Sequence, residues 1–278
     1  MRNNQQRLRR SAAAAINKAE PANPPMGFVS PTEFVELPSR GEFYPEDHPL
    51  HKQETVEIRF MTAKDEDILS SQALLKKGLA IDRLIENLMV LDVDAKTLLL
   101  GDRSAIILAA RISGYGSEYK FSHSCVNCTT RSDMAYNLNF SEITGECFDE
   151  KFLRKNNIVY DSSTATLDIT LPTSGVRIGI CPVDGYGEKQ LTAEGQNNEN
   201  SLITSVLASF IVKVNDETDF NTVMSFIESM PAKDSKFIRN LYPKLVPNIK
   251  MSHSYICDNC GKLNNLEVPL TAEFFWPE

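Results

Sequence analysis

Two stretches decide the fold of this chain, Cys125-Val-Asn-Cys128 and Cys257-Asp-Asn-Cys260, because each carries the same C-x-x-C pattern in matching surroundings. Before each pair, three residues at alternate positions share a strand face with the first cysteine. They are Tyr119, Phe121 and His123 in the first stretch, and Met251, His253 and Tyr255 in the second. After the pairs, Met134, Tyr136 and Leu138 correspond to Leu266, Val268 and Leu270. Each stretch therefore predicts a strand, a cysteine turn and a second strand.

The four cysteines Cys125, Cys128, Cys257 and Cys260 are predicted to bind one structural zinc ion. Zinc prefers four ligands in a tetrahedron, and a tight turn lets two cysteines separated by two residues reach one metal. One turn supplies half of the ligands, and two turns complete the set. The long insertion between the turns is tolerated because loop-closure entropy grows slowly with loop length. The metal would join the C-terminal strands to the middle of the chain as a split zinc ribbon.

Other interpretations of the cysteines fit the sequence less well. A reducing cytosol disfavours paired disulfides, and a thioredoxin-like redox motif requires a βαβ setting that is missing here. A catalytic zinc needs an open ligand position, which four thiolates do not leave. His123 and His253 are expected to be core residues or to lie just outside the ligands, with a role as substitute ligands as the alternative. Cys147 and Cys181 have no partner motif, and Cys181 is expected to be a buried thiol.

Composition and charge exclude several classes of function. The 278 residues are 42% hydrophobic and 24% charged, as in ordinary globular proteins. No apolar run approaches the ~20 residues that a membrane helix needs. The arginines near the N-terminus precede no apolar stretch, so no secretory signal is expected. The net charge of −8 argues against nucleic acid as the main ligand and favours protein partners.

The N-terminal part is expected to be a tail followed by an extended segment. Residues 1–27 predict a flexible tail, in which the Pro-rich stretch Pro21-Ala-Asn-Pro-Pro25 acts as a linker. An arm that becomes ordered against a partner is the alternative. Residues 28–60 contain a turn at Leu37-Pro-Ser-Arg-Gly41 and a strand at Val56-Glu-Ile-Arg-Phe60.

Three helices are predicted between the first strand and the first cysteine pair. The first begins at a capping box made by Thr62 and Asp65 and ends at Lys77-Gly78. Its apolar side contains Ile68, Leu69, Leu74 and Leu75, and the second helix has Ile81, Leu84, Ile85 and Leu88 at helical spacing. The third begins near Asp102, which is expected to cap it, and ends at Gly114-Tyr115-Gly116.

The region between the cysteine pairs is expected to mix strands and helices. Alternating apolar residues on both sides of Pro172-Thr-Ser-Gly175 predict a hairpin over 167–180. Helices are predicted over 200–213, 219–229 and 232–241, with Asp219 as a cap and Pro231 in the first turn of the last helix. The turn at 37–41 also resembles Leu171-Pro-Thr-Ser-Gly175, although an LPxxG pattern arises easily by chance.

These elements predict an α+β fold with helical segments, β-hairpins and a split zinc ribbon. The expected organisation is a tail at 1–27 and an extended and helical region at 28–118. The two halves of the ribbon lie at 119–140 and 249–278. A hairpin and helices form an insertion at 141–248.

No catalytic constellation is evident in the sequence. It has no glycine-rich phosphate loop, G-x-S-x-G, H-E-x-x-H or calcium loop, and none of the four histidines lies beside a convincing nucleophile. Gly101-Asp102-Arg103 could serve a site, but a helix cap explains Asp102 more simply. An enzyme is therefore not expected.

Several stretches together resemble the T4-type bacteriophage baseplate hub assembly proteins. They are the helix Leu98-Leu-Leu-Gly-Asp-Arg-Ser-Ala-Ile-Ile-Leu-Ala-Ala-Arg-Ile-Ser-Gly-Tyr-Gly116 before the first C-x-x-C, the earlier Leu37-Pro-Ser-Arg-Gly-Glu-Phe-Tyr-Pro45 and Met61-Thr-Ala-Lys-Asp-Glu-Asp67, and the late C-x-x-C with Phe274-Phe-Trp276. The resemblance spans most of residues 30–278. It implies a non-enzymatic part or assembly factor of a contractile phage tail, acting in the host cytoplasm during assembly or remaining in the virion baseplate.

Three hypotheses about function follow. The first is a structural or assembly protein of a phage baseplate, whose partners are other baseplate or tail hub proteins. The second is a zinc-ribbon nucleic-acid-binding or transcription accessory protein, although the cysteine turns are flanked by few basic residues: Lys120, Arg131, Lys250 and Lys262. The third is a zinc-dependent enzyme, which a closed set of four ligands opposes. The sequence fixes neither the oligomeric state nor the identity of the partners.

Overall fold

The structure is a computed structural model, which describes residues 30–197, 202–268, 270 and 272–275. The chain divides into two units, residues 1–31 and 32–278, and the second unit contains every element named below. The tail predicted at residues 1–27 lies outside the described residues. Helices and antiparallel strands alternate along the second unit, which confirms the predicted mixture of α and β structure. No helix in the described part of the chain is long and apolar enough to cross a membrane.

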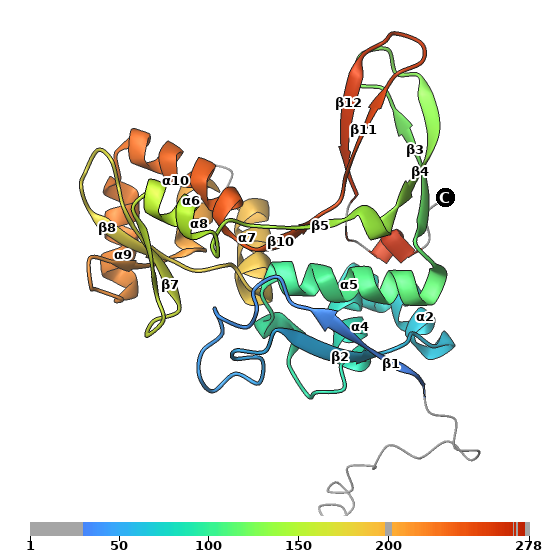
Figure 1. The fold of residues 1–278 in the computed structure, drawn as a ribbon, viewed down its shortest axis with the longest axis horizontal. Coiled ribbons are helices and arrows are strands. Elements are labelled where there is room, and N and C mark those ends of the chain that lie inside the picture. The colour runs from blue at the N-terminus through green and yellow to red at the C-terminus, as the bar shows by residue number, and fades with distance from the viewer. Residues whose placement is uncertain (1–29, 198–201, 269, 271, 276–278) are drawn as a thin grey trace, which may run out of the picture. The chain divides into compact units, whose positions relative to one another are not determined.

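The unit begins with two antiparallel strands and three helices (Figure 1). These are β1 (Thr32–Glu36), β2 (Thr55–Arg59), α2 (Ala63–Ser70), α3 (Gln72–Lys76) and α4 (Ala80–Leu88). The predicted capping box is present, since the Asp65 carboxylate accepts hydrogen bonds from the amide and hydroxyl of Thr62. The single helix predicted up to Gly78 is wrong, because the extended backbone of Ser71 separates α2 from α3. Leu75, which was expected on the buried side, is exposed.

A short helical turn, η1 (Ala95–Thr97), leads into the long helix α5 (Leu100–Tyr115). The helix starts earlier than the sequence predicts, so Gly101 lies in its first turn rather than before it. A Cβ at Gly101 would lie 2.2 Å from the carbonyl oxygen of Pro247, so only glycine allows this close contact between α5 and the C-terminal part of the chain. The helix ends at Gly116, as predicted, where φ is 83°.

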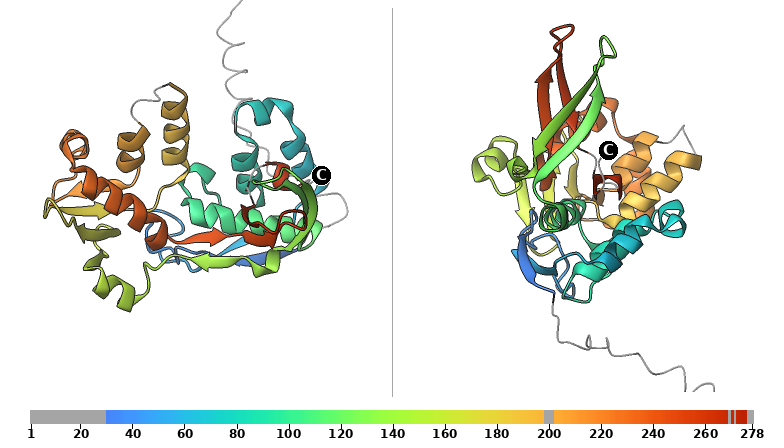
Figure 2. Two further views of the ribbon diagram at one scale, coloured as in Figure 1. Left: turned by 90° about the horizontal axis from the view of Figure 1, so that it is seen from above. Right: turned by 90° about the vertical axis from the view of Figure 1, so that its right-hand side faces the viewer.

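Each cysteine pair lies in the turn of a β-hairpin. The first hairpin is β3 (Glu118–Ser124) with β4 (Arg131–Asn137), and the second is β11 (Ser252–Ile256) with β12 (Leu263–Glu267). The predicted strand, turn and strand are therefore confirmed in both stretches. The two hairpins lie side by side (Figures 1 and 2), and near them are η2 (Leu138–Phe140), η4 (Ala272–Phe275) and the short pair β5 (Glu142–Thr144) with β10 (Asn248–Lys250).

Between the hairpins, the chain forms a four-stranded antiparallel sheet of order β6-β7-β8-β9. Its strands are β6 (Ile158–Asp161), β7 (Thr166–Thr170), β8 (Arg177–Ile180) and β9 (Ile211–Val214), and the hairpin predicted over 167–180 is β7 with β8. The helices are α6 (Glu150–Lys155), α7 (Gly185–Asn197), α8 (Leu202–Ala208), α9 (Phe220–Ser229) and α10 (Ala232–Leu245). The predicted helix over 200–213 is wrong after Ala208. Three of the four residues of β9 are β-branched, which suits pairing with β8 better than a helix.

The other two helices predicted in this region are present. Asp219 caps α9 by accepting a hydrogen bond from the Thr222 amide, as predicted. Helix α10 continues to Leu245, past the predicted end at 241, and Pro231 lies at its N-cap position rather than in its first turn. The buried side chains form one apolar core that includes residues of the helices, Tyr119 and Tyr136 of the first cysteine hairpin, and Met251 and Val268 on either side of the second.

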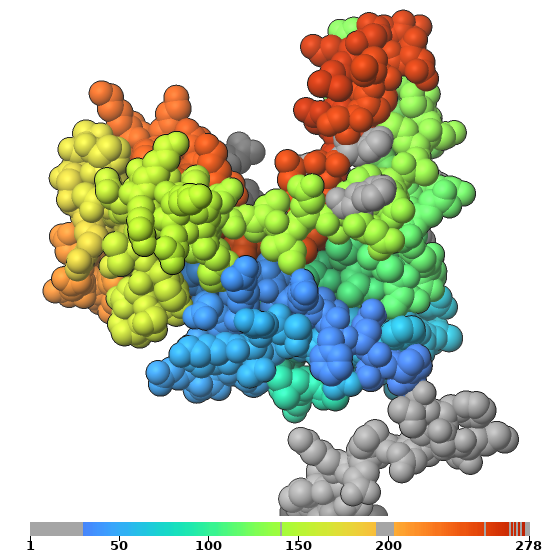
Figure 3. Space-filling view, viewed as in Figure 1, coloured from blue at the N-terminus to red at the C-terminus, as the bar shows by residue number. Residues whose placement is uncertain are grey.

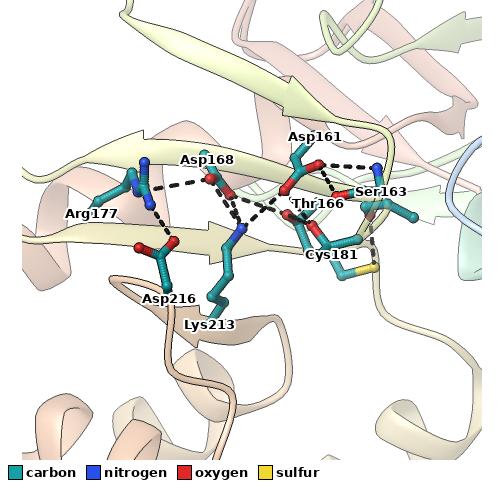
Figure 4. A network of polar contacts seen from close by, with 10 residues as sticks. Asp161, Ser163, Thr166, Asp168, Arg177, Cys181, Lys213 and Asp216 are labelled. Atoms are coloured by element: carbon teal, nitrogen blue, oxygen red, sulfur yellow. Dashed lines mark hydrogen bonds and ion pairs between the residues drawn. The ribbon is translucent and has the colours of Figure 1, made fainter.

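Charged side chains cover the face of the four-stranded sheet opposite its apolar core (Figure 4). Lys213 on β9 is 7% exposed, and its ammonium lies 2.9 Å from Asp168 on β7 and 3.4 Å from Asp161 on β6. A Cβ at Gly179 of β8 would lie 2.8 Å from Cε of Lys213, so glycine leaves room for the lysine to cross the strand. The network thus ties three strands together from their outer face.

Both LPxxG turns are held by an aspartate in the first turn of a helix. Asp102 on α5 accepts hydrogen bonds from the amide and hydroxyl of Ser39, at 3.0 and 2.6 Å. Asp234 on α10 accepts hydrogen bonds from the amides of Thr173 and Ser174, at 2.8 and 2.9 Å. The prediction that Asp102 caps its helix is wrong, because its carboxylate is occupied by a turn far away in sequence.

The shared turn belongs to a repeat that covers most of the unit. The first half, residues 32–137, and the second half, residues 166–268, contain equivalent elements in the same order. The equivalent pairs are β1 and β7, β2 and β8, α2 and α7, α4 and α8, α5 and α10, β3 and β11, and β4 and β12. The pairing registers also agree, since Val35 lies opposite Val56 as Ile169 lies opposite Ile178, and Met89 bridges to Ile58 as Ile211 pairs with Ile180. The two sequence echoes are thus parts of one structural duplication.

Candidate metal centre

The two hairpins bring the four cysteines together. Their sulfur atoms all lie within 4.8 Å of one another, although Cys128 and Cys257 belong to opposite halves of the repeat. Two close approaches join the hairpins: Cys125 Sγ lies 3.7 Å from Cys260 Sγ, and Cys128 Sγ lies 3.6 Å from Cys257 Sγ. In the space-filling view, the red atoms of the second hairpin lie against the green atoms of the first (Figure 3).

Each cysteine turn has the same backbone hydrogen bonds. In the first, the Cys125 amide donates to the Thr130 carbonyl, and the Thr129 amide donates back to Cys125. In the second, the Cys257 amide donates to the Lys262 carbonyl, and the Gly261 amide donates back to the Cys257 carbonyl. Thr129 and Gly261 both have positive φ, at 58° and 68°. This turn directs the two sulfurs of each pair to one side, which explains why the C-x-x-C spacing suits a shared ligand.

Polar groups of both hairpins surround the sulfurs. Asn264 of the second hairpin is buried, and its amide nitrogen lies 3.6 Å from Cys125 Sγ while its oxygen accepts from the Val126 amide. Asn259 donates to the hydroxyl of Thr130 in the first hairpin, at 3.1 Å. These contacts cross from one hairpin to the other, so the polar surroundings hold the two turns in a fixed relation.

The electrostatics of the cluster favour a bound cation. Hydrogen bonding with Thr130 is the largest effect that lowers the pKa of Cys128, to about 5. The amides of Cys260 and Asn259 favour the thiolate of Cys257, but burial and the neighbouring Cys128 outweigh them and raise the pKa of Cys257 to about 11. The protein thus stabilises some of the thiolates, while their mutual repulsion disfavours a full set. A metal dication would remove that repulsion.

The geometry fits a tetrahedral metal ion. With Zn–S bonds of about 2.3 Å, tetrahedral geometry places ligand sulfurs roughly 3.8 Å apart. The separations of 3.6 and 3.7 Å between the hairpins agree with this spacing. They are far longer than the ~2.05 Å of a disulfide bond. Four soft thiolates are the donors that zinc accepts, whereas magnesium and calcium prefer oxygen.

Of the two histidines near the pairs, His123 does not join the cluster. The His123 ring is half-buried and packs edge-on to the ring of Tyr255, with centroids 6.1 Å apart. Nε2 of His123 and the hydroxyl of Tyr255 have no hydrogen-bond partner among the described residues. This position agrees with a residue packed beside the ligands. The side chain of His253 lies outside what the structure describes.

The remaining two cysteines lie outside the cluster. Burial raises the pKa of both Cys147 and Cys181 to about 12. The residue Cys181 is partly buried, whereas Cys147 is fully buried. The sulfur of Cys181 lies 3.6 Å from the carbonyl oxygen of Ala165. Both thiols stay protonated near neutral pH, which makes them poor nucleophiles and poor metal ligands.

The charged side chains of the Gly-Asp-Arg stretch make structural contacts. Besides Ser39, the Asp102 carboxylate accepts a hydrogen bond from the hydroxyl of Tyr44 at 2.8 Å. Arg103 is 8% exposed, pairs with Asp82 at 2.8 Å, and donates to the carbonyl oxygen of Ala95. Asp102 and Arg103 thus both make contacts that hold the fold together, and Arg103 also lines a cavity beside Asp82 and Lys189.

Sequence reasoning found the four cysteines but missed the residues that orient them. Asn264 and Thr130 hydrogen-bond to groups of the other hairpin or to the sulfurs, yet neither belongs to a recognisable motif. Asn264 holds the place in the second stretch that Ser132 holds in the first, so the similarity between the two stretches did not indicate a role for Asn264. The roles of Asn264 and Thr130 become visible only in the structure, where the two hairpins contact each other.

The comparisons with known proteins identify a family. A family model described as T4 bacteriophage base plate protein matches residues 31–276. Searches of curated proteins and of solved structures found no significant match. The matched region includes both halves of the repeat and all four cysteines. Because the family model covers most of the sequence, the chain belongs to the T4 bacteriophage base plate protein family.

Proposed function

We propose that this protein is a non-enzymatic structural or assembly component of the baseplate hub of a contractile phage tail, stabilised by a structural zinc ion. The family match carries the baseplate role. The four converging thiolates support the zinc. The protein would work by presenting surfaces to other baseplate or tail hub proteins, in the host cytoplasm during assembly and in the tail if it stays in the virion.

The contacts of the polar residues support binding rather than catalysis. In the described part of the chain, the buried charged groups Asp102, Asp234 and Arg103 are all hydrogen-bonded to backbone or to structural partners. The cysteine cluster offers four ligands to one ion, which would leave that ion no open position for a substrate. Such a centre supplies folding energy, not chemistry.

The metal would act by fixing the position of the second hairpin. Cys128 and Cys257 are separated by most of the second half, so the centre fastens the C-terminal strands to the hairpin that follows α5. Zinc removal is expected to loosen both hairpins and to disturb the surfaces beside them. Assembly would then fail without the loss of any reaction.

The alternative is a zinc-ribbon protein that binds nucleic acid. The acidic charge of −8 opposes it, because phosphate neutralisation by Lys and Arg supplies most of such affinity. A gel-shift assay at physiological salt should show weak binding or none. Tight binding with a steep salt dependence would favour the alternative.

The zinc site is tested first on the purified full-length protein. Elemental analysis should find about one zinc per chain, and Cys257→Ser should remove or greatly weaken it. Cys181→Ser is the matched control, because this cysteine lies outside the cluster and its loss should leave the zinc in place. Protein made with ample zinc but carrying none would refute the structural zinc.

The function is tested in the phage. A phage whose only copy of the gene carries Cys125→Ser with Cys128→Ser should accumulate heads and lack functional tails. A phage with Cys181→Ser should assemble normally. Normal contractile tails from the double variant, with the variant protein confirmed as the only source, would refute the proposed role.

A further inference from the structure

The two halves of the repeat differ at one edge of their sheets. In the second half, β7 pairs with β8 on one side and with β6 on the other. In the first half, the equivalent strand β1 pairs with β2 alone among the described residues (Figure 1). The position that β6 holds beside β7 therefore has no described counterpart beside β1.

The open edge of β1 presents backbone groups suited to another strand. The Leu37 amide donates to the Glu54 carbonyl across the β1–β2 pair. Hydrogen-bonded and non-hydrogen-bonded pairs alternate along antiparallel strands, so Val35 and Glu33 also bond toward β2. Phe34 and Glu36, between them, direct their amide and carbonyl groups to the open edge. Unpaired edges of this kind are templates for strand addition.

A buried carboxylate oxygen also lacks a partner at this edge. Oε1 of Glu33 is shielded from solvent and has no hydrogen-bond partner among the described residues. The equivalent residue of β7 is the buried Leu167, which lies opposite Tyr160 of β6. A shielded carboxylate oxygen without a partner costs free energy, and a cationic side chain placed opposite it would offset that cost.

The outer face of the first-half sheet is apolar where that of the second half is ionic. Asp168 and Lys213 form an ion pair that Asp161 of β6 completes (Figure 4). At the equivalent positions, the first half has Phe34 and Leu91, which are 71% and 42% exposed. Large apolar side chains at this exposure favour a partner that covers them.

We infer that the open edge of β1 receives an antiparallel strand from another baseplate protein, in the position that β6 holds on β7. The pairings of β6 set the chemistry of that strand. The residue opposite Val35 is aliphatic, as Ile158 is opposite Ile169. The residue two positions later is Lys or Arg, facing Glu33. The residue between them is apolar and covers Phe34. The inference rests on the proposed baseplate role and specifies the partner segment.

The sequence before β1 is a poor occupant of the same edge. By the spacing of β6 to β7, the equivalent segment is 24–27, which begins with Pro24 and Pro25. Proline has no amide hydrogen to donate to a strand, so this segment could not form the ladder that β6 forms. A strand from another protein fits the edge better.

Photo-crosslinking in assembling phage tests the edge directly. A photoreactive phenylalanine analogue replaces Glu36, whose side chain is exposed beside the edge, and mass spectrometry identifies the crosslinked peptide. We expect one segment of a baseplate protein, containing an aliphatic residue followed two positions later by Lys or Arg. Phe34→Pro removes the amide that faces the edge and should reduce the crosslink at least tenfold, whereas Phe34→Thr keeps the amide and should retain more of it.

Glu33→Leu separates recognition from folding, because it installs the residue that the second half has at this position. It should reduce the crosslink severalfold while leaving thermal stability equal or higher, since a shielded carboxylate oxygen without a partner is removed. Three results would overturn the inference: no crosslink from Glu36, an equal yield with Phe34→Pro, or a crosslink to the chain's own first 29 residues or a second copy. The same analogue placed at Val212, an exposed residue of β9, is the control position. A crosslink from Val212 to a baseplate protein, with none from Glu36, would refute strand addition at β1 but not the baseplate role.

Discussion

Asp102 of helix α5 holds the turn at 37–41 and Tyr44 through three hydrogen bonds, so its removal should destabilise the fold. Asp102→Ala removes an acceptor shared by the Ser39 amide, the Ser39 hydroxyl and the Tyr44 hydroxyl, at 3.0, 2.6 and 2.8 Å. Ser39 and Tyr44 are each 1% exposed, and Asp102 is fully buried. Water therefore has no access to the three donors that the substitution would leave unpaired.

The magnitude follows from these contacts. A hydrogen bond to a charged acceptor contributes about 1.5–3 kcal/mol, so three bonds give a gross contribution of roughly 4–9 kcal/mol. Burial opposes this, because it raises the pKa of Asp102 and so penalises the ionised carboxylate, although the hydrogen bonds from Ser39 and Tyr44 act the other way. We expect a net loss of about 3–5 kcal/mol in the free energy of unfolding, because each buried donor left without an acceptor costs about 1–3 kcal/mol and removal of the desolvated carboxylate offsets part of the total. In a chain of this size, such a loss lowers Tm by roughly 10 °C.

Urea unfolding followed by circular dichroism measures the loss, with two variants for comparison. Tyr44→Phe removes one of the three donors and the acceptor of the Leu99 amide, so it should cost about 1–3 kcal/mol. Asp234→Ala in the second half leaves the amides of Thr173 and Ser174 without their acceptor, two donors where Asp102→Ala leaves one amide and two hydroxyls, and it should cost less. If Asp102→Ala stays within about 1 kcal/mol of the wild type at an unchanged m-value, the turn does not depend on this carboxylate.

Three further predictions concern ionisable groups. Burial alone would raise the pKa of Asp65, but hydrogen bonds from Arg59 and Thr62 outweigh it and hold the pKa at about 2, below its ordinary 3.8. Its contribution to stability is therefore complete above about pH 4 and is lost as the pH falls toward 2. Asp65→Asn should flatten the acid side of the stability curve, and a curve parallel to the wild type would contradict this. Lys213→Met keeps most of the side-chain length but leaves Asp168 without its closest cation, so urea unfolding should show a loss of about 2 kcal/mol. An unchanged midpoint would mean that the network is dispensable. Because burial raises the pKa of Cys147 and Cys181 to about 12, iodoacetamide at pH 8 should label neither in the folded protein, and a chelator should expose only the four cysteines of the metal centre; labelling of Cys147 before unfolding would argue against its burial.

The sequence predicts features whose signals lie close together along the chain. The capping box at Thr62, the cap at Asp219 and the hairpin around Gly175 each depend on residues within a few positions of one another. The cysteine turns are also local, and their matched flanks indicated that they act as a pair. Zinc chemistry then predicted that the pairs meet, which the structure confirms for the sulfur atoms.

The errors arise where distant contacts override a local preference. An aspartate near the start of a helix is commonly a cap, but the carboxylate of Asp102 is taken by a turn 63 residues earlier. The segment at Ile211–Val214 follows a helix and is apolar enough to extend it, yet β8 offers it an open edge. Asn264 belongs to no motif, and its role exists only because the other hairpin lies against it.

The repeat explains why a metal site between the two cysteine hairpins would be useful. Each half supplies only two thiolates, so neither half completes a site and the centre forms only when both hairpins are in place. Joining Cys128 to Cys257 closes a loop of more than a hundred residues, for which the length-dependent entropic cost is about 4 kcal/mol. Structural zinc sites contribute about 10–16 kcal/mol, so a zinc ion bound to the four cysteines would outweigh that cost by a wide margin. The first half, by contrast, has no strand on the outer edge of β1 among the described residues, where the second half has β6 beside β7. A duplicated chain joined through its two cysteine hairpins can therefore cover the sheet edge of one half and leave that of the other available to a partner. This is the arrangement expected of an assembly component.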